Sequence, residues 1–243
     1  MEITSLNNDY IKELVKLKER KNRKEQGVFL VEGEHLVEEA YKKGILKELV
    51  LLIGSDYKLD VKTTYVTREI INKITNLDNS PNIIGVCSIT NDNVITGDKI
   101  LLLDRIQDPG NLGTIIRSSK AFNIDTIVIS KDSVDLYNPK VLRATEGIIF
   151  HINIVVEDLN IAIDNIKSNN IPLYGTKVDN GESIKSITDK SKYAIIMGNE
   201  GQGVNQELLD KCDKYLYIDM NKEVESLNVG VATSIILYEF NNK

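Results

Sequence analysis

The chain has 243 residues, of which 42% are hydrophobic and 27% are charged. This composition supplies a core for one large or two modest domains, since domains usually span about 100–200 residues. The formal net charge of −6 argues against a uniformly basic nucleic-acid binder, although phosphate contact requires only a local basic patch. The absence of a long apolar run and the charged N-terminus predict neither a membrane span nor a secretory signal, so we expect a cytoplasmic protein.

Cysteine and histidine are scarce, which bounds the chemistry of any site. Cys87 and Cys212 are the only cysteines, and His35 and His151 are the only histidines. Such a set makes neither a disulfide framework nor a zinc site, and no carboxylate cluster has the spacing of metal ligands. We therefore expect two buried thiols, two structural histidines and no metal.

The first 92 residues alternate helices with short apolar strands, which is typical of an α/β domain. The first helix begins near Asn8 or Asp9, and Thr67 is a candidate cap for a later one. The predicted strands of this part are 28–31, 49–53 and 83–89. The polar segment 90–98 has no periodicity and predicts a linker between two domains, residues 1–92 and 98–243.

A basic run lies between Lys12 and Lys24, in the region of the first predicted helix. Glu13 and Glu19 are its only acidic residues, so the local charge is positive in an acidic protein. A solvated helix face is one interpretation of this run, and RNA contact is the other. The candidate RNA-binding residues are Lys18, Arg20, Lys21, Arg23 and Lys24.

The second half repeats the alternation with strands that have no polar face. Its predicted strands are 100–103, 126–129, 152–156, 193–197 and 215–218. Strands that are apolar on both faces are typical of a parallel sheet covered by helices on both sides. The final predicted helix, 227–240, is apolar nearly all round, which predicts burial in a core or at an interface.

Three polar loops follow strands of this second half: 108–117, 198–203 and 218–228. Ligands of open α/β sheets bind beyond the carboxyl ends of the strands, so the loops predict one shared pocket containing Arg117 and Glu200. The loops match neither the dinucleotide fingerprint nor a P-loop. Ordinary strand–turn–helix joints remain an alternative, with Ser226 or Asn228 acting only as a helix cap.

The same loops carry recognisable motifs. Segments 111–117 (NLGTIIR), 198–201 (GNEG) and 226–229 (SLNV) resemble, in order and spacing, the three motifs of the SpoU (TrmH) family of RNA 2′-O-ribose methyltransferases. Segment 29–40 (FLVEGEHLVEEA) resembles the N-terminal RNA substrate-binding domain of that family. The resemblance thus covers nearly the whole chain.

This resemblance implies a small N-terminal α/β RNA-binding domain and a C-terminal parallel-sheet α/β domain with a deep trefoil knot. It further implies S-adenosyl-L-methionine (AdoMet) bound in the knot, and a homodimer whose RNA site draws residues from both subunits. The implied catalytic residues are Asn111, Arg117, Glu200, Ser226 and Asn228. The implied cofactor-binding residues are Gly198, Ile218, Met220 and Leu227.

Two positions depart from the family pattern. Asp219 stands where the third motif commonly has a proline, which puts the stiffness of that loop in doubt. The segment Thr145-Glu146-Gly147 places a carboxylate where the family often has a small residue or methionine.

The resemblance favours 2′-O-methylation of large-subunit ribosomal RNA. Methylation of transfer RNA is the alternative within the enzyme class. A catalytically inactive RNA-binding assembly factor is an alternative of another class, but such a protein has no need of all five catalytic residues. A nicotinamide dehydrogenase is disfavoured, because no GxGxxG follows a predicted strand.

Overall fold

The computed structural model of the protein describes residues 1–75, 77, 79–90, 94–178, 181–221 and 223–242. The chain forms two compact units, Met1–Asn91 with Asp135–Phe150, and Asp92–Val134 with His151–Lys243. Residues 91–93 of the predicted linker lie outside the described residues. The sequence places 135–150 in the second domain, whereas these residues pack within the first unit.

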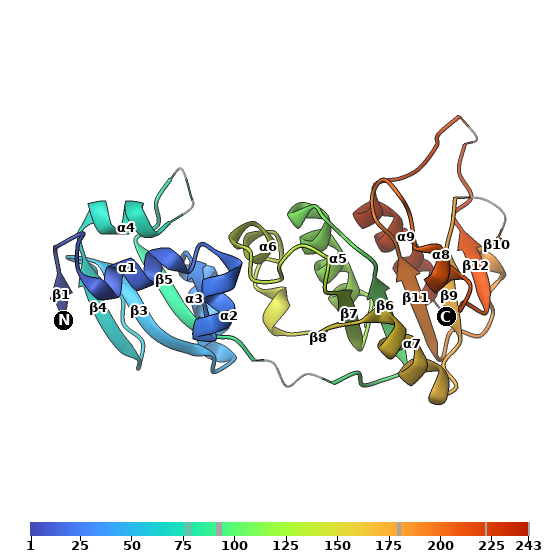
Figure 1. Ribbon diagram of the computed structural model, residues 1–243, viewed down its shortest axis with the longest axis horizontal. Coiled ribbons are helices and arrows are strands. Elements are labelled where there is room, and N and C mark those ends of the chain that lie inside the picture. The colour runs from blue at the N-terminus through green and yellow to red at the C-terminus, as the bar shows by residue number, and fades with distance from the viewer. Residues whose placement is uncertain (76, 78, 91–93, 179–180, 222, 243) are drawn as a thin grey trace. The chain divides into compact units, whose positions relative to one another are not determined.

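The first unit contains a mixed five-stranded sheet in the order β1-β4-β3-β5-β2 (Figure 1). Its strands are β1 (Glu2–Ile3), β2 (Val28–Glu32), β3 (Leu46–Leu52), β4 (Lys62–Val66) and β5 (Ile83–Ser88). Strand β5 runs antiparallel to β2 and β3, while β4 is parallel to β1 and β3. Strands β1 and β4 were not predicted from the sequence. The sheet therefore has two more strands than the apolar runs indicated.

Three helices of the first unit bury apolar residues: α1 (Asp9–Lys16), α3 (Glu34–Lys42) and α4 (Arg68–Ile74). Helix α2 (Arg20–Gln26) has no apolar residue and buries only Arg23. The predicted start of the first helix is confirmed, because the Asn8 side chain accepts a hydrogen bond from the Tyr10 amide at 3.0 Å. Ile11, Val50 and Ile70 meet in one core cluster that joins α1, β3 and α4.

Residues 135–150 pack in the first unit through aromatic and ionic contacts. They form α6 (Pro139–Ala144) and the 3₁₀ turn η1 (Ile148–Phe150). The Tyr137 ring lies 4.4 Å from the Phe29 ring, centroid to centroid. Arg23 is paired with Asp135, and the His35 ring lies 3.2 Å from the Glu146 carbonyl oxygen. The apolar periodicity of one segment does not reveal such pairings between distant segments.

The second unit is built on a seven-stranded sheet in the order β10-β12-β9-β11-β6-β7-β8. Its strands are β6 (Lys99–Leu103), β7 (Thr126–Ser130), β8 (Asn153–Glu157), β9 (Leu173–Thr176), β10 (Glu182–Ser183), β11 (Tyr193–Met197) and β12 (Lys214–Tyr217). Every neighbouring pair is parallel, so the predicted parallel sheet is confirmed. Strands β9 and β10 were not predicted, and β9 lies between β11 and β12.

Helices cover this sheet. They are α5 (Pro109–Ala121), α7 (Leu159–Ser168), α8 (Gln206–Leu209) and α9 (Val229–Asn241), with a 3₁₀ turn η2 (Ile184–Ser186). Helices α7 and α8 pack on one face, where their leucines and isoleucines join Leu102 and Ile196 in one cluster. Helices α5 and α9 pack against each other, with a 2.7 Å hydrogen bond between the hydroxyls of Ser118 and Ser234. The parallel order brings the carboxyl ends of β6 and β11 together, so the loops after them are neighbours.

Candidate active site

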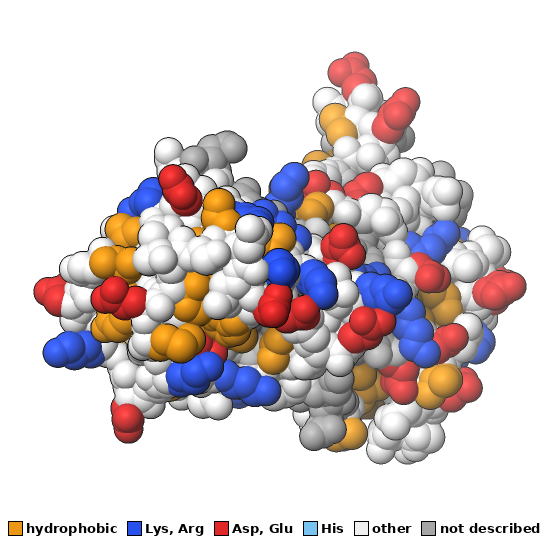
Figure 2. Space-filling view, turned by 60° about the vertical axis from the view of Figure 1, so that its left-hand side comes forward, with side chains coloured by type: hydrophobic (Ala, Val, Ile, Leu, Met, Phe, Trp, Pro, Cys, Tyr) orange, Lys and Arg blue, Asp and Glu red, His pale blue; other side chains and the backbone are white. Residues whose placement is uncertain are grey.

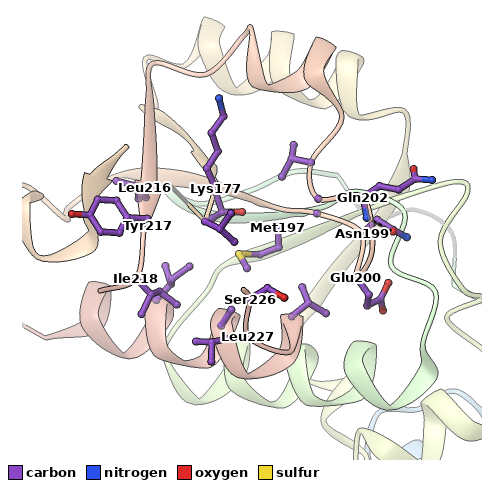
Figure 3. Close-up of a pocket in the computed structure, with 18 of the residues that line it drawn as sticks. Lys177, Met197, Asn199, Glu200, Gln202, Leu216, Tyr217, Ile218, Ser226 and Leu227 are labelled. Atoms are coloured by element: carbon purple, nitrogen blue, oxygen red, sulfur yellow. Dashed lines mark hydrogen bonds between the residues drawn. The ribbon is translucent and has the colours of Figure 1, made fainter. Parts of the chain in front are cut away.

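A cavity of about 510 Å³ lies in the second unit, at the carboxyl ends of β9, β11 and β12. This volume is in the range of small-molecule and cofactor sites, about 300–1,000 Å³. The four residues predicted to contact the cofactor all line it: Gly198, Ile218, Met220 and Leu227. In Figure 3, Asn199, Glu200 and Gln202 lie together at one end of the pocket, and Tyr217 and Ile218 lie at the other. The second and third predicted loops therefore form one pocket.

The second loop doubles back at Gly198, where no other residue fits. A Cβ atom at Gly198 would lie 2.1 Å from the Val204 nitrogen and 2.2 Å from the Gly203 carbonyl carbon, well inside van der Waals contact. Asn199 and Gly203 close the loop with two backbone hydrogen bonds, at 3.0 and 2.9 Å. The pocket wall is thus made of close-packed backbone.

Glu200 joins the second loop to the first through hydrogen bonds. It accepts from the Asn111 side-chain amide at 3.0 Å, from the Asp108 backbone amide at 3.1 Å and from the Gln107 backbone amide at 3.3 Å. Burial alone raises the pKa of Glu200, but these donors outweigh it and hold the pKa below its usual value of 4.5. Glu200 is therefore a carboxylate at neutral pH.

Asn228 adds the third loop to this network. Its side-chain amide donates to the Asn111 side-chain oxygen at 2.8 Å. Its own oxygen accepts from the backbone amides of Gly230 and Val231 at 3.0 and 3.2 Å and so caps α9. Asn228, rather than Ser226, is the helix cap that the sequence left undecided, and the same side chain also reaches Asn111.

The structure brings three of the five predicted catalytic residues into one hydrogen-bonded chain: Asn111, Glu200 and Asn228. Ser226 lines the cavity without a hydrogen bond to any described residue. Arg117 is exposed on α5, six residues beyond Asn111 and so about 9 Å along the helix axis. Its guanidinium has no hydrogen bond or ion pair within the described ranges, and Arg117 does not line the cavity.

The two departures from the family motifs have defined surroundings. The Asp219 carboxylate accepts a 2.6 Å hydrogen bond from the Ser183 hydroxyl, which ties the third loop to β10. Glu146 belongs to the first unit and adopts a φ of 49°. Asp219 thus restrains the third loop through a side-chain hydrogen bond, whereas a proline would restrain it by fixing the backbone φ angle.

The predicted RNA-binding residues fall into two groups. Lys21 and Lys24 are exposed, and Arg20 is exposed with an ion pair to Asp135 at 3.7 Å. Lys18 is half-buried and donates to the Thr75 carbonyl oxygen at 2.9 Å. On the face drawn in Figure 2, basic side chains are interspersed with acidic ones.

Arg23 has structural partners. It is only 4% exposed, donates to the carbonyl oxygens of Leu17 and Lys18, and pairs with Asp135. These contacts use four of the five N–H groups of the buried Arg23 guanidinium. The structure therefore gives Arg23 a packing role, and its RNA contact stays a prediction.

The described ranges contain no group of three or more histidine, cysteine, aspartate or glutamate residues that could hold a metal ion. Within the same ranges, no helix is both long and apolar enough to cross a bilayer.

Three residues that line the pocket come from a part of the chain that the sequence analysis did not single out. They are Thr176, Lys177 and Val178, which end or follow β9.

Comparison with known families identifies the class. Residues 98–238 match the SpoU rRNA Methylase family, and residues 8–85 match the MRM3-like substrate binding domain. The chain therefore belongs to the SpoU rRNA methylase family.

Individual relatives align over the full length. The 23S rRNA (guanosine(2553)-2′-O)-methyltransferase RlmP of Bacillus subtilis is 38% identical over 242 residues, which cover 98% of each protein. The AdoMet-bound rRNA methyltransferase from Sinorhizobium meliloti has a TM-score of 0.85 at 28% identity, covering 99% of this chain and 97% of that one. A crystal structure of an RNA 2′-O ribose methyltransferase has a TM-score of 0.83 at 29% identity, covering 99% and 98%.

Proposed function

We propose that this protein transfers a methyl group from AdoMet to a ribose 2′-hydroxyl of large-subunit ribosomal RNA in the cytoplasm. The observation that supports this proposal most strongly is a hydrogen-bonded network at the edge of a cofactor-sized cavity. The network links Glu200, Asn111 and Asn228. The full-length similarity to the Bacillus subtilis relative supports the guanosine that corresponds to position 2553 as the target.

The pocket residues fit AdoMet. Ile218, Met220 and Leu227 offer apolar contacts to an adenine ring, and the tight backbone at Gly198 offers carbonyl and amide groups at close approach. When bound, AdoMet supplies a methyl group on a sulfonium, which is already a good donor. The protein's tasks are therefore to align the 2′-oxygen and to manage its proton.

The hydrogen-bonded chain fixes two side-chain amides. The Glu200 carboxylate can only accept, so it sets which end of Asn111 is the donor. The Asn111 oxygen then accepts from Asn228, whose own oxygen is held by the start of α9. The side-chain nitrogens of Asn111 and Asn228 each keep a second N–H group that takes no part in this hydrogen-bonded network. We assign these two N–H groups, with the Ser226 hydroxyl, to holding the ribose.

Arg117 acts as a cation in this proposal. A guanidinium has a pKa above about 12, so a neutral arginine is a poor general base. The exposed Arg117 side chain instead holds an RNA phosphate and lowers the pKa of the ribose hydroxyl. Another group, or water, takes the proton.

We also propose a homodimer formed through α9. Val231, Ile235 and Tyr238 are 47%, 37% and 57% exposed and recur at positions i, i+4 and i+7, which form one stripe on a helix. An exposed apolar stripe is typical of an interface. The RNA site then draws residues from both subunits, with Arg117 on the helix that packs against α9. Likeness to SpoU methyltransferase structures supports a trefoil knot in residues 98–243.

RNA recognition is assigned to the N-terminal domain, residues 1–92. The match of residues 8–85 to a substrate-binding domain supports this assignment. The exposed cations Arg20, Lys21 and Lys24 are the candidate phosphate contacts.

Calorimetric titration with AdoMet and S-adenosylhomocysteine tests the cofactor site. We expect micromolar binding to the wild type and loss of binding in Leu227→Arg, because the new side chain would place a charge on the pocket wall. Ile161→Arg is the matched control, since Ile161 is 58% exposed on α7 and does not line the cavity. A wild type that binds neither compound would remove the enzyme proposal and leave an RNA-binding assembly factor.

A further inference from the structure

Arg105, which follows β6, has a left-handed backbone with a φ of 55°. This conformation crowds the Cβ atom of any residue except glycine, and asparagine and aspartate tolerate it better than most others. A strained backbone persists only where its surroundings enforce it, and such positions gather at functional sites. An arginine at this position, where a glycine would be unstrained, indicates that the Arg105 side chain makes contacts that the fold requires.

The turn at Arg105 directs its guanidinium to three residues at once. The Nε and Nη2 atoms each lie 3.0 Å from the Asp104 carboxylate oxygens. The Nη1 atom donates to the Gln202 side-chain oxygen at 2.8 Å, and Nη2 also donates to the Gly203 carbonyl oxygen at 3.3 Å. The planar fork thus bridges the end of β6 and the loop after β11. A lysine ammonium, a single compact head, cannot span these three acceptors in the same way.

Asp104 fastens both ends of the same loop. It is 4% exposed, and its backbone amide donates to the Met197 carbonyl oxygen at 2.9 Å. Its carboxylate also accepts from the Asn205 backbone amide at 2.8 Å. The Arg105 carbonyl oxygen accepts from the Asn199 side chain at 2.8 Å, near the start of the loop. Asp104 and Arg105 therefore hold residues 198–204 at both ends and, through Gln202, near the centre.

We infer that Arg105 is a positioning residue that sets the shape of loop 198–204, and with it the cofactor pocket and Glu200. The inference rests on the proposed function for its catalytic meaning. Figure 3 shows Gln202, which Arg105 holds, beside Asn199 and Glu200 at one end of the pocket. Arg105 itself does not line the cavity, so it acts through the loop.

Arg105→Lys and Gln202→Ala test this inference. The first keeps a cation beside Asp104 but removes the fork, and the second removes one contact while leaving the Asp104–Arg105 pair intact. Loss of one or two hydrogen bonds that order a loop predicts an AdoMet Kd raised by about tenfold in Arg105→Lys. Gln202 itself lines the cavity, so Gln202→Ala is compared by the exchange of the loop amides. Arg68→Lys is the matched control, because Arg68 in the first unit likewise donates to carbonyl oxygens, those of Ser80 and Pro81, and does not line the pocket.

Hydrogen exchange of the ligand-free protein gives the second readout. We expect the amides of residues 199–204 to exchange at least fivefold faster in Arg105→Lys and in Gln202→Ala, with an unchanged Tm and unchanged exchange elsewhere. Wild-type exchange in this loop for both variants, or an AdoMet Kd within twofold of the wild type, would overturn the inference. A wild type that fails to bind AdoMet would instead contradict the proposed function. The comparison of hydrogen exchange between wild type and variants would still decide the role of Arg105.

Discussion

Glu200→Gln changes the network at the pocket edge without changing its size. The glutamine keeps one oxygen acceptor, but it loses the charge and turns an amide group toward donors from Gln107, Asp108 and Asn111. A hydrogen bond to a charged group contributes about 1.5–3 kcal/mol, and the exposure of Glu200 reduces the net loss to about 2 kcal/mol. This loss corresponds to a decrease of about thirtyfold in kcat/KM.

Transfer of a tritiated methyl group from AdoMet to ribosomal RNA measures this loss. Glu207→Gln is the matched control, since Glu207 is exposed on α8 and does not line the cavity. We expect a near-normal Tm in both variants and reduced transfer only in Glu200→Gln. A kcat/KM within twofold of the wild type would refute the idea that the Glu200 carboxylate orders Asn111.

The pH dependence of the wild type follows from the same contacts. The pKa of Glu200 is lowered below its usual value of 4.5, so the folded protein favours the carboxylate. The stabilisation it gives is complete above that value and is lost only as the pH falls through the lowered pKa. The protection of the loop amides, which is their exchange rate relative to the intrinsic rate at each pH, should therefore stay constant between about pH 5 and 8.

Three further variants test other parts of the proposal. Arg117→Lys should lower kcat at least tenfold, because lysine cannot make the bidentate contact that arginine makes with a phosphate. Near-full methyl transfer across the pH range would count against the role of Arg117 as a planar, fixed cation. Ile235→Glu should shift the protein to a monomer in sedimentation, because it places a charge in the apolar stripe of α9; an unchanged dimer mass would move the interface elsewhere. Replacing Lys21 and Lys24 with alanine should reduce the slope of log K for RNA against log salt by about two, and an unchanged slope would leave them a solvated helix face.

The parallel sheet of the second unit was predictable because its central strands have no polar face. Leu102 and Ile196 are fully buried and belong to strands that periodicity predicted well. Strand β9 was missed because it is four residues long and contains Gly175. Its glycine is required by packing, since a Cβ atom there would lie 2.7 Å from the Leu209 side chain. That requirement depends on a helix more than thirty residues away in sequence, so local propensity carries no sign of it.

The first unit was harder to predict for two physical reasons. Strand β4, Lys62–Val66, is half polar and is held between β1 and β3 rather than by its own hydrophobicity. Arg23 lies in a basic run that looks solvent-facing, yet its partner Asp135 is more than one hundred residues away. Charge patterning shows the sign of a surface but not the long-range pair that removes one cation from it.

The candidate site was predictable as a set of residues but not as a network. Three motifs at strand ends indicated that Asn111, Glu200 and Asn228 share a pocket, and the structure places them in direct contact. The motifs did not indicate Arg105, because a positive φ at an arginine has no signature in the sequence. They also did not show that Arg117 lies outside the hydrogen-bonded chain.

The central claim is that the methyl group goes to a ribose 2′-oxygen of large-subunit ribosomal RNA. The most direct measurement incubates the purified protein with AdoMet and unmodified large-subunit RNA and then maps the methylated nucleotides by resistance to alkaline cleavage. We predict one new alkali-resistant linkage, at the guanosine corresponding to position 2553 named for the Bacillus subtilis relative. At limiting enzyme, we expect the Glu200→Gln protein to form it about thirtyfold more slowly. Methylation of a base, or transfer to transfer RNA with none to ribosomal RNA, would contradict the claim.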